Sequence, residues 1–224
     1  MTTIAPSERA QVATACQRLA AHGLLIGTAG NVSLRCGDLV AVTATGAVLA
    51  QVTAEDVTVV DLSGQVVAGR YAPTSELGLH LDIYRTYDTQ AVVHTHAPKA
   101  TAIACVLDEL PVIHYQQLLL GGATRVVPFH PFGTVELADA VRTALRGRQS
   151  ALMANHGAVT VGASLDQAVE SALLLEWACA LYLDAISIGR PRELTEQQQA
   201  AVVEVALRTG YGTRKPLEKD IECT

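Results

Sequence analysis

The stretch Ala91-Val92-Val93-His94-Thr95-His96 decides how the rest of this chain is interpreted. Its first three residues are apolar and rich in β-branched side chains, which predicts a short buried strand that continues into the histidines. Side chains at positions i and i+2 of a strand point to the same face, roughly 6.5 Å apart along the backbone. His94 and His96 are therefore expected to converge on one side of a sheet, where two imidazoles can share one cation.

A third histidine follows another apolar run far downstream, since Asn155-His156-Gly157 comes directly after Ala151-Leu152-Met153-Ala154. Three histidine nitrogens with one open position are what a catalytic zinc ion needs, because the vacancy admits substrate. A lone histidine is more often a core or surface residue than a ligand. An HxH pair at one strand end together with a histidine at a second strand end favours a metal site formed by His94, His96 and His156.

The composition describes one large globular α/β domain, with 224 residues of which 50% are hydrophobic and 17% charged. No linker or repeat divides it, so we expect a single domain over residues 1–224. The formal net charge of -6 provides no basic surface for nucleic acid or for an anionic membrane. Residues 1–10 lack the apolar core of a secretory signal, and the most apolar stretch, residues 171–183, is expected to be too short and too charged to span a bilayer. Five dispersed cysteines without a CxxC pair are typical of a cytoplasmic protein with reduced thiols.

The order of the predicted elements indicates a mixed sheet covered by helices on both faces. Two early hairpins are expected, and later strands alternate with helices. The expected strands are residues 32–35, 39–43, 57–62, 65–68, 91–96, 124–129, 151–154 and 158–161, and the expected helices are residues 7–22, 73–87, 98–107, 135–145, 165–188 and 195–208.

Three polar segments contain the residue types of a phosphate pocket. The glycine-rich turn Gly27–Ser33 has backbone amides and an Asn31 side chain that can face an anion. Thr43–Gly46 ends a strand with a hydroxyl and a glycine, and Thr74 and Ser75 lie where the free amides of a helix N-terminus point. Each signal is weak alone. In an acidic protein, their coexistence with the histidines predicts a phosphate held mostly by amides and hydroxyls.

Glu76 falls in the expected first turn of the helix that opens at Pro73. Acidic residues are common at this position because they complement the helix dipole. In the functional interpretation, Glu76 lies beside a metal and removes a proton from a carbon next to a carbonyl group. The metal then stabilises the resulting enediolate, so the cation and the glutamate share the acid and base work.

The segments GTAGNVS, TSE, HTH, IHY and NHG, in this order and at these separations, resemble the class II zinc aldolases of the L-fuculose-1-phosphate aldolase family. The wider superfamily includes L-ribulose-5-phosphate 4-epimerase. The resemblance extends from the first helix to about Gly212. It implies a three-layer αβα sandwich with a mixed, mostly antiparallel sheet, assembled as a homotetramer. It also implies cleavage of a ketose 1-phosphate into dihydroxyacetone phosphate and an aldehyde through a metal-stabilised enediolate.

The resemblance further implies a set of site residues. His94, His96 and His156 would bind one zinc ion per subunit, with Glu76 as the fourth ligand at rest and as the acid/base during turnover. Tyr115 matches a tyrosine that reaches a neighbouring subunit's site and assists at the aldehyde oxygen, and Tyr211 matches a second tyrosine in the tail. The residues that match the family's phosphate-binding stretches are Gly30, Asn31, Thr45, Gly46, Thr74 and Ser75.

This chain departs from the family pattern at two places. Thr74 stands where the family usually has the first of two serines, and its added methyl group can favour a different substrate. One extra residue precedes Tyr211 in the tail. His80, His114 and His130 are additional histidines, which we interpret as structural or as supports for the metal ligands.

The superfamily leaves other activities open. The 4-epimerases typically carry aspartate at position 76 and a longer insertion between the second and third metal histidines, so Glu76 and the short spacing favour the aldolase. Decarboxylases and dehydratases that act on a sugar phosphate or sugar acid share the three histidines and remain alternatives. A non-catalytic interaction domain like the adducin head predicts missing metal histidines, and all three are present here.

Overall fold

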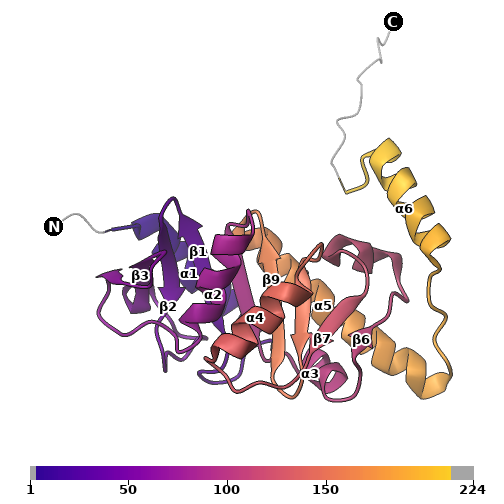
Figure 1. Ribbon diagram of the computed structural model, residues 1–224, viewed down its shortest axis with the longest axis horizontal. Coiled ribbons are helices and arrows are strands. Elements are labelled where there is room, and N and C mark those ends of the chain that lie inside the picture. Colours follow the sequence, from indigo (N-terminus) through magenta and orange to yellow (C-terminus); the bar gives the residue numbers. More distant parts are fainter. Residues whose placement is uncertain (1–3, 213–224) are drawn as a thin grey trace, which may run out of the picture. The chain divides into compact units, whose positions relative to one another are not determined.

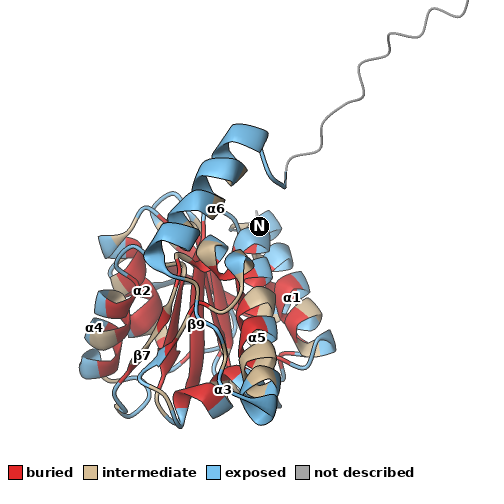
Figure 2. Cartoon of the chain, turned by 90° about the vertical axis from the view of Figure 1, so that its right-hand side faces the viewer, coloured by how far each residue is buried: buried red, intermediate tan, exposed pale blue. Residues whose placement is uncertain are grey.

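The computed structural model describes residues 4–212 of the chain, which divides into two compact units, Met1–Glu193 and Leu194–Thr224. The first unit contains the sheet and its covering helices (Figure 1). The second contains the helix α6 (Glu196–Thr209), which has no buried residue and is exposed along its length in Figure 2. The single domain expected over residues 1–224 stays a prediction.

One nine-stranded sheet forms the centre of the first unit, in the strand order β4-β3-β2-β1-β5-β9-β8-β7-β6. Neighbouring strands are antiparallel throughout, except that β7 and β8 run parallel. This confirms the mixed, mostly antiparallel sheet. The strands are β1 (Asn31–Cys36), β2 (Leu39–Thr43), β3 (Val57–Asp61), β4 (Val66–Ala68), β5 (Ala91–Thr95), β6 (Glu109–Leu110), β7 (Thr124–Val127), β8 (Ser150–Met153) and β9 (Gly157–Gly162).

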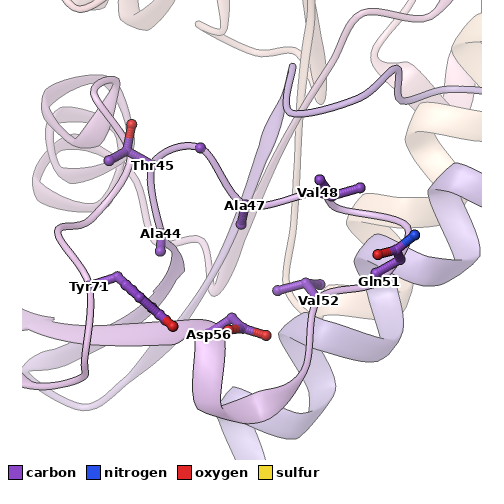
Figure 3. Close-up of a pocket in the computed structure, with 9 residues that line it drawn as sticks. Ala44, Thr45, Ala47, Val48, Gln51, Val52, Asp56 and Tyr71 are labelled. Carbon is purple, nitrogen blue, oxygen red and sulfur yellow. The ribbon is translucent and has the colours of Figure 1, made fainter.

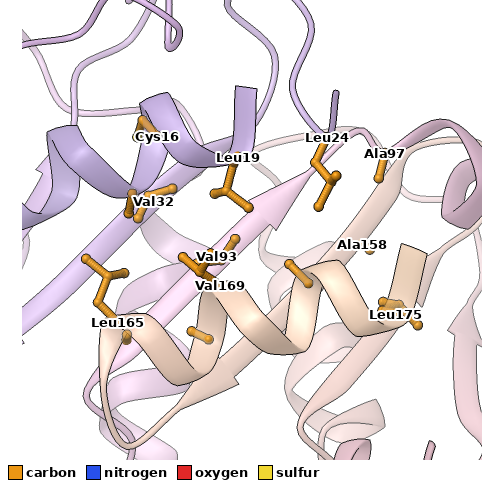
Figure 4. Packing of buried hydrophobic residues seen from close by; sticks show 14 of the residues in the cluster. Cys16, Leu19, Leu24, Val32, Val93, Ala97, Ala158, Leu165, Val169 and Leu175 are labelled. Atoms are coloured by element: carbon orange, nitrogen blue, oxygen red, sulfur yellow. The ribbon is translucent and has the colours of Figure 1, made fainter. Parts of the chain in front are cut away.

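Helices cover both faces of the sheet, which confirms the three-layer αβα sandwich (Figure 1). On one face, α1 (Pro6–Ala21), α3 (Pro98–Ala104) and α5 (Leu165–Ile188) share an apolar cluster with Val32 and Val93, as Figure 4 shows in part. On the other face, α2 (Leu77–Thr86) and α4 (Val135–Ala144) pack with Val92. Successive strand side chains point to opposite faces, so Val92 and Val93 enter different clusters although both are buried.

The helix α5 is, by length and composition alone, long and apolar enough to cross a membrane. This corrects the sequence argument, which took residues 171–183 as too short and too charged. Core helices pass the same test. Here Leu165, Val169 and Leu175 of α5 lie in the apolar cluster that also contains Val93 (Figure 4). The apolar side chains in the first part of α5 thus serve the packing of the sandwich, whereas Trp177, Ile186 and Ile188 are exposed.

The helix expected over residues 73–87 begins later than the sequence predicts. It starts at Leu77, so Glu76 is its N-cap residue and not part of its first turn. Pro73 instead bridges to Ala44, and the Thr74 N–H donates to the Thr43 carbonyl. These contacts hold Pro73 and Thr74 beside the end of β2, which brings two of the predicted phosphate-binding segments together. Smaller elements were not predicted, namely β6 and the 3₁₀ turns η1 (Ala54–Asp56) and η2 (Tyr115–Leu120).

Candidate metal centre and active site

The three predicted metal ligands meet at one end of two neighbouring strands. His94 belongs to β5, His96 follows its end, and His156 lies in the turn between β8 and β9. Because β5 and β9 are antiparallel, with Thr95 opposite Ala158, the end of β5 lies beside the start of β9. The ligand nitrogens of the three histidines all lie within 4.8 Å of one another. The structure therefore brings the three predicted histidines close enough together to bind one metal ion.

The Asn-His-Gly turn has a steric reason to contain these residue types. Asn155 has a φ of 56°, in the left-handed region that asparagine tolerates better than most residues. A Cβ atom on Gly157 would lie 2.2 Å from the carbonyl oxygen of Thr95. Glycine thus allows β9 to approach β5 closely enough for His156 to face the other two histidines.

His94 shows most clearly that the site suits a cation. Its Nδ1 lies 3.0 Å from the carbonyl oxygen of Ala158, so Nδ1 carries the hydrogen and donates it. The other nitrogen, Nε2, then directs its lone pair toward His96 Nε2 at 3.0 Å and Glu76 Oε2 at 3.1 Å. A positive ion among these atoms would be attracted by the imidazole lone pairs and by the carboxylate. Three histidine nitrogens and a carboxylate oxygen fit a tetrahedral zinc ion.

Burial also favours the form of the histidines that binds metals. It lowers the pKa of His96 to about 4, with help from the nearby His94 and His156. Burial and the nearby His94 also lower the pKa of His156, against an opposing effect of Glu76. Both rings are therefore neutral at pH 7, and only a neutral imidazole offers a lone pair to a metal.

Glu76 is buried and turned toward the histidines, and its side chain makes no helix-capping bond. Its Oε2 accepts a hydrogen bond of 2.9 Å from Asn31 Nδ2. Its Oε1 lies 3.7 Å from His156 Nε2 and has no hydrogen-bond partner among the described residues. Burial raises the pKa of Glu76, whereas the hydrogen bond that Asn31 donates lowers it. The placement favours the functional interpretation over a helix-dipole role.

The predicted phosphate-binding residues line the same cavity as the metal centre. This cavity measures about 670 Å³ and has Glu76, His96 and His156 in its wall. All six residues suggested for phosphate also line it, namely Gly30, Asn31, Thr45, Gly46, Thr74 and Ser75. Gly30 has a φ of 91°, and a Cβ there would lie 2.8 Å from the His94 carbonyl oxygen, so glycine lets this turn reach the end of β5.

Ala44, Thr45 and Gly46 line both this cavity and a second one of about 280 Å³. Figure 3 shows the residues that line the second cavity. Tyr71 and Asp56 lie in the wall of the second cavity, and its remaining lining residues are mostly apolar. None of the three histidines lines it, so the chemistry gathers in the larger cavity.

The two predicted tyrosines are not among the described residues that line the 670 Å³ cavity. Tyr115 begins η2, stacks on His114 with 4.6 Å between ring centroids, and does not line the 670 Å³ cavity of its own chain within the described range. Its loop is fixed by Gln117, whose buried side chain accepts from two backbone N–H groups and donates to the Pro111 carbonyl. Tyr211 follows α6 in the second unit and is exposed.

Sequence reasoning missed the loop between β7 and α4, which lines the 670 Å³ cavity. Phe129 and Phe132 are 61% and 69% exposed, and they line the cavity together with His130 and Pro131. We predicted a strand as far as Phe129 and a structural or supporting role for His130. The available signal was the stretch PFHPFG, in which two phenylalanines stand among prolines and a glycine that do not suit a strand interior.

Comparison with known proteins agrees with this geometry. The family model of the class II aldolase and adducin N-terminal domain matches residues 10–183. The chain belongs to this family. The match covers every residue of the candidate site except Tyr211, so the resemblance seen in the short motifs extends through the whole sandwich of this class II aldolase-family chain.

Individual members of the family are similar over nearly the whole chain. A 5-deoxy-D-ribulose 1-phosphate aldolase of Bacillus thuringiensis serovar kurstaki is 36% identical over 208 residues, covering 92% of this chain and 97% of that protein. A 5-methylthioribulose-1-phosphate/5-deoxyribulose-1-phosphate aldolase of Rhodospirillum rubrum is 34% identical, covering 90% and 92%. Among solved structures, an L-fuculose 1-phosphate aldolase superposes with a TM-score of 0.86 at 30% identity, covering 92% and 97%.

Proposed function

We propose that this aldehyde-lyase of the class II aldolase family cleaves a ketose 1-phosphate into dihydroxyacetone phosphate and an aldehyde. The observation that carries the proposal is the shared cavity, in which three histidines and a buried carboxylate face the predicted phosphate-binding segments. Aldol cleavage needs both parts, because the phosphate fixes the substrate while charge develops on its carbonyl oxygen.

We assign the metal as zinc, held by His94, His96 and His156, with Glu76 as the fourth ligand in the resting enzyme. The donor types and the orphaned Glu76 Oε1 support this assignment. When bound, the cation would polarise the substrate carbonyl and stabilise the negative charge that develops on its oxygen.

The residues of the chain itself supply binding and proton transfer. No lysine or arginine is among the described residues that line the cavity, so amides and hydroxyls of the three segments would hold the phosphate. In the direction of cleavage, the hydroxyl group that becomes the aldehyde oxygen releases its proton to solvent, the carbon–carbon bond breaks, and its electron pair stays on the ketone-side carbon as an enediolate. Protonated Glu76 then gives its proton to that carbon and regains one from solvent. In condensation, Glu76 removes the same proton.

We place Tyr115 in the active site of a neighbouring subunit, within a homotetramer, where its hydroxyl would assist at the aldehyde oxygen. Its exposure and its position outside the cavity of its own chain support this arrangement. The role of Tyr211 as a second tyrosine of the site belongs to the same proposal. The cysteines within the described residues are all free, which agrees with a cytoplasmic enzyme.

The aldehyde half of the substrate has two candidates. Phe129 and Phe132 give the cavity an apolar side, which suits an aldehyde with a methyl end. The relatives named for 5-deoxyribulose 1-phosphate and the structure named for L-fuculose 1-phosphate both concern sugars with such an end. We favour 5-deoxy-D-ribulose 1-phosphate because the relative named for it is 36% identical.

The test is a screen of ketose 1-phosphates for release of dihydroxyacetone phosphate, with and without a metal chelator. The two 1-phosphates above are compared with L-ribulose 5-phosphate and with sugar acids. We expect release from a 1-phosphate that stops after chelation and returns with added zinc. Epimerisation of the 5-phosphate, or loss of carbon dioxide or water from an acid without release of dihydroxyacetone phosphate, would replace the aldolase assignment.

A further inference from the structure

A chain of buried hydrogen bonds connects α2 to the carboxylate of Glu76. The Tyr84 hydroxyl lies 2.7 Å from Ser33 Oγ, which lies 2.6 Å from His80 Nδ1. The other ring nitrogen of His80 contacts Asn31 Oδ1, and Asn31 Nδ2 donates to Glu76 Oε2 at 2.9 Å. All five side chains are buried, and Ser33 and His80 are 0% exposed. The proposed chemistry uses none of the three groups farthest from the carboxylate.

The direction of every hydrogen bond in this chain follows from its end at the carboxylate. Carboxylate oxygens only accept, so Asn31 must turn its NH2 group toward Glu76 and its Oδ1 toward His80. The His80 Nε2 must then carry the ring hydrogen and donate it to Asn31. Burial lowers the pKa of His80 to about 3, so the ring is neutral and has only this one N–H. Its bare Nδ1 accepts from the Ser33 hydroxyl.

Tyr84 completes the chain by donating its O–H to Ser33 Oγ. Burial raises the pKa of Tyr84 well above its usual value, so the phenol keeps its proton and remains a donor. The four hydrogen bonds all point toward Glu76, and bonds aligned in this way polarise one another in the low dielectric of a protein interior. The far end of the chain thereby fixes the tautomer of His80, and His80 fixes the orientation of the Asn31 amide.

We propose that His80 is a positioning residue for proton transfer by Glu76, because it holds Asn31 in the orientation that pins Glu76 Oε2. The proposal rests on the acid/base role of Glu76 given above. With Oε2 pinned, Oε1, which has no hydrogen-bond partner among the described residues, is the oxygen left to exchange the proton. An amide rotated by 180° has nearly the same shape but turns its oxygen to the carboxylate, which repels it. No proton travels along the chain.

Two variants of His80 distinguish the loss of its N–H donor from the loss of the imidazole ring itself. His80→Leu removes the donor to Asn31, and we expect kcat to fall roughly 10–100-fold, as for other supporting partners of metal-site residues. His80→Gln keeps a side-chain N–H that can reach Asn31, so it should recover most of that loss. The metal content should stay close to wild type in both variants.

A more direct measurement follows the α-proton of dihydroxyacetone phosphate as it exchanges with deuterated water. This exchange requires Glu76 but no cleavage of a carbon–carbon bond. We expect the exchange rate to fall most in His80→Leu, less in Ser33→Ala and least in Tyr84→Phe, following the distance from the carboxylate.

The protein offers a matched control for the loss of a buried hydroxyl group. Ser150 of β8 is, like Ser33, a fully buried strand serine, and its hydroxyl lies 3.0 Å from that of Thr124, away from the hydrogen-bond chain. Ser150→Ala should lower the melting temperature about as much as Ser33→Ala without changing the exchange rate. Equal losses of exchange in the two variants would reduce the chain to a structural network and overturn the proposal.

A tautomer measurement tests the inference independently of any substrate. In the metal-loaded protein labelled with ¹⁵N-histidine, the His80 signals should report a hydrogen on Nε2 and none on Nδ1. A hydrogen on Nδ1 would overturn the inferred direction, even if His80→Leu does not fold. If wild-type protein fails to exchange the α-proton while His80 shows the expected tautomer, the proposed aldolase function fails and the geometry of the chain stands.

Discussion

The two ends of β5 are both buried, but they bury opposite kinds of side chain. Ala91, Val92 and Val93 are 0% exposed and enter the two apolar clusters of the sandwich. His94, one residue further on, is equally inaccessible but directs a bare nitrogen at His96 and at the carboxylate of Glu76. Within one strand, apolar side chains that stabilise the fold by burial are thus followed directly by a polar side chain. The burial of this polar side chain needs a separate explanation.

The difference shows how this fold tolerates a polar site in its interior. Burying a polar group costs free energy unless it is hydrogen bonded, and the cost of an unpaired group is about 1–3 kcal/mol. Here most polar atoms around the site have fixed partners, such as the Ala158 carbonyl for His94 and Asn31 for Glu76. The atoms left over, the histidine lone pairs and Glu76 Oε1, are those that a cation would satisfy. Substitutions at the two ends of β5 should therefore have separate effects.

The largest loss of metal binding and turnover should come from a substitution at the polar end of β5. His94→Ala removes the ligand that lies nearest both His96 and Glu76, so we expect bound metal and turnover to fall below detection. Elemental analysis of freshly purified protein measures the metal directly. Stoichiometric metal retained after replacement of His94, His96 and His156 together by alanine would contradict the assigned site.

Glu76→Gln should remove turnover while sparing the metal. The side chain keeps its size but can no longer take a proton, and loss of a general base typically costs roughly 10²–10⁴-fold in rate. Metal content and melting temperature should stay near wild type, since three histidines remain. Near-normal α-proton exchange in this variant would instead assign Glu76 to the helix dipole.

Gly157→Ala tests the close approach that brings β9 to the polar end of β5. The added Cβ would lie 2.2 Å from the Thr95 carbonyl oxygen, so the turn that holds His156 must shift. We expect metal affinity to fall roughly 10–100-fold, as it does when a supporting contact is lost. The control is Gly78→Ala in α2, where a Cβ meets no atom within 4 Å and helix propensity favours alanine. Unchanged metal affinity in Gly157→Ala would show that the turn can relax at no cost.

Mixing two inactive variants tests whether the site extends over two subunits. Tyr115→Phe and Glu76→Gln homo-oligomers are combined under conditions that exchange subunits. If Tyr115 acts in a neighbour's site, some hybrid sites pair two intact residues, and part of the activity returns. Hybrids that form but stay inactive would place Tyr115 and Glu76 in the site of one chain, contrary to our proposal.

The apolar end of β5 was predictable from the sequence because its signal is local. A short run of β-branched residues indicates a buried strand wherever both faces of a sheet are covered. The histidines were predictable for a similar reason, since HxH spacing and a second strand end are visible in adjacent residues. The start of α2 was not, because Pro73 suits a helix start as well as an extended segment. The bridge to Ala44, nearly thirty positions earlier, decides between them.

The hydrogen bonds that hold Glu76 in place could not be predicted from the sequence either. Asn31 was assigned to phosphate, but the structure shows its oxygen on His80 and its NH2 group on Glu76. The proposed contact of Asn31 with phosphate can therefore use only the second N–H of that amide. His80 was interpreted only as structural or supporting. Its partners Ser33 and Asn31 lie more than forty positions away, and no periodic pattern connects them.

The smallest effect on the site should come from the apolar end. Val93→Ala removes two methyl groups from a position with no exposed surface, between α1 and α5 in Figure 4. Each buried methyl or methylene group contributes about 0.8 kcal/mol, and a residual cavity adds to the loss. We expect the free energy of unfolding to fall by about 2 kcal/mol in denaturant titration, with metal content and α-proton exchange unchanged. Because Val93 points to the face opposite its neighbour His94, the deleted volume need not disturb the imidazole. A loss of metal as large as the loss of stability would show that packing and ligand geometry in β5 are coupled, and the separation between its two ends would be wrong.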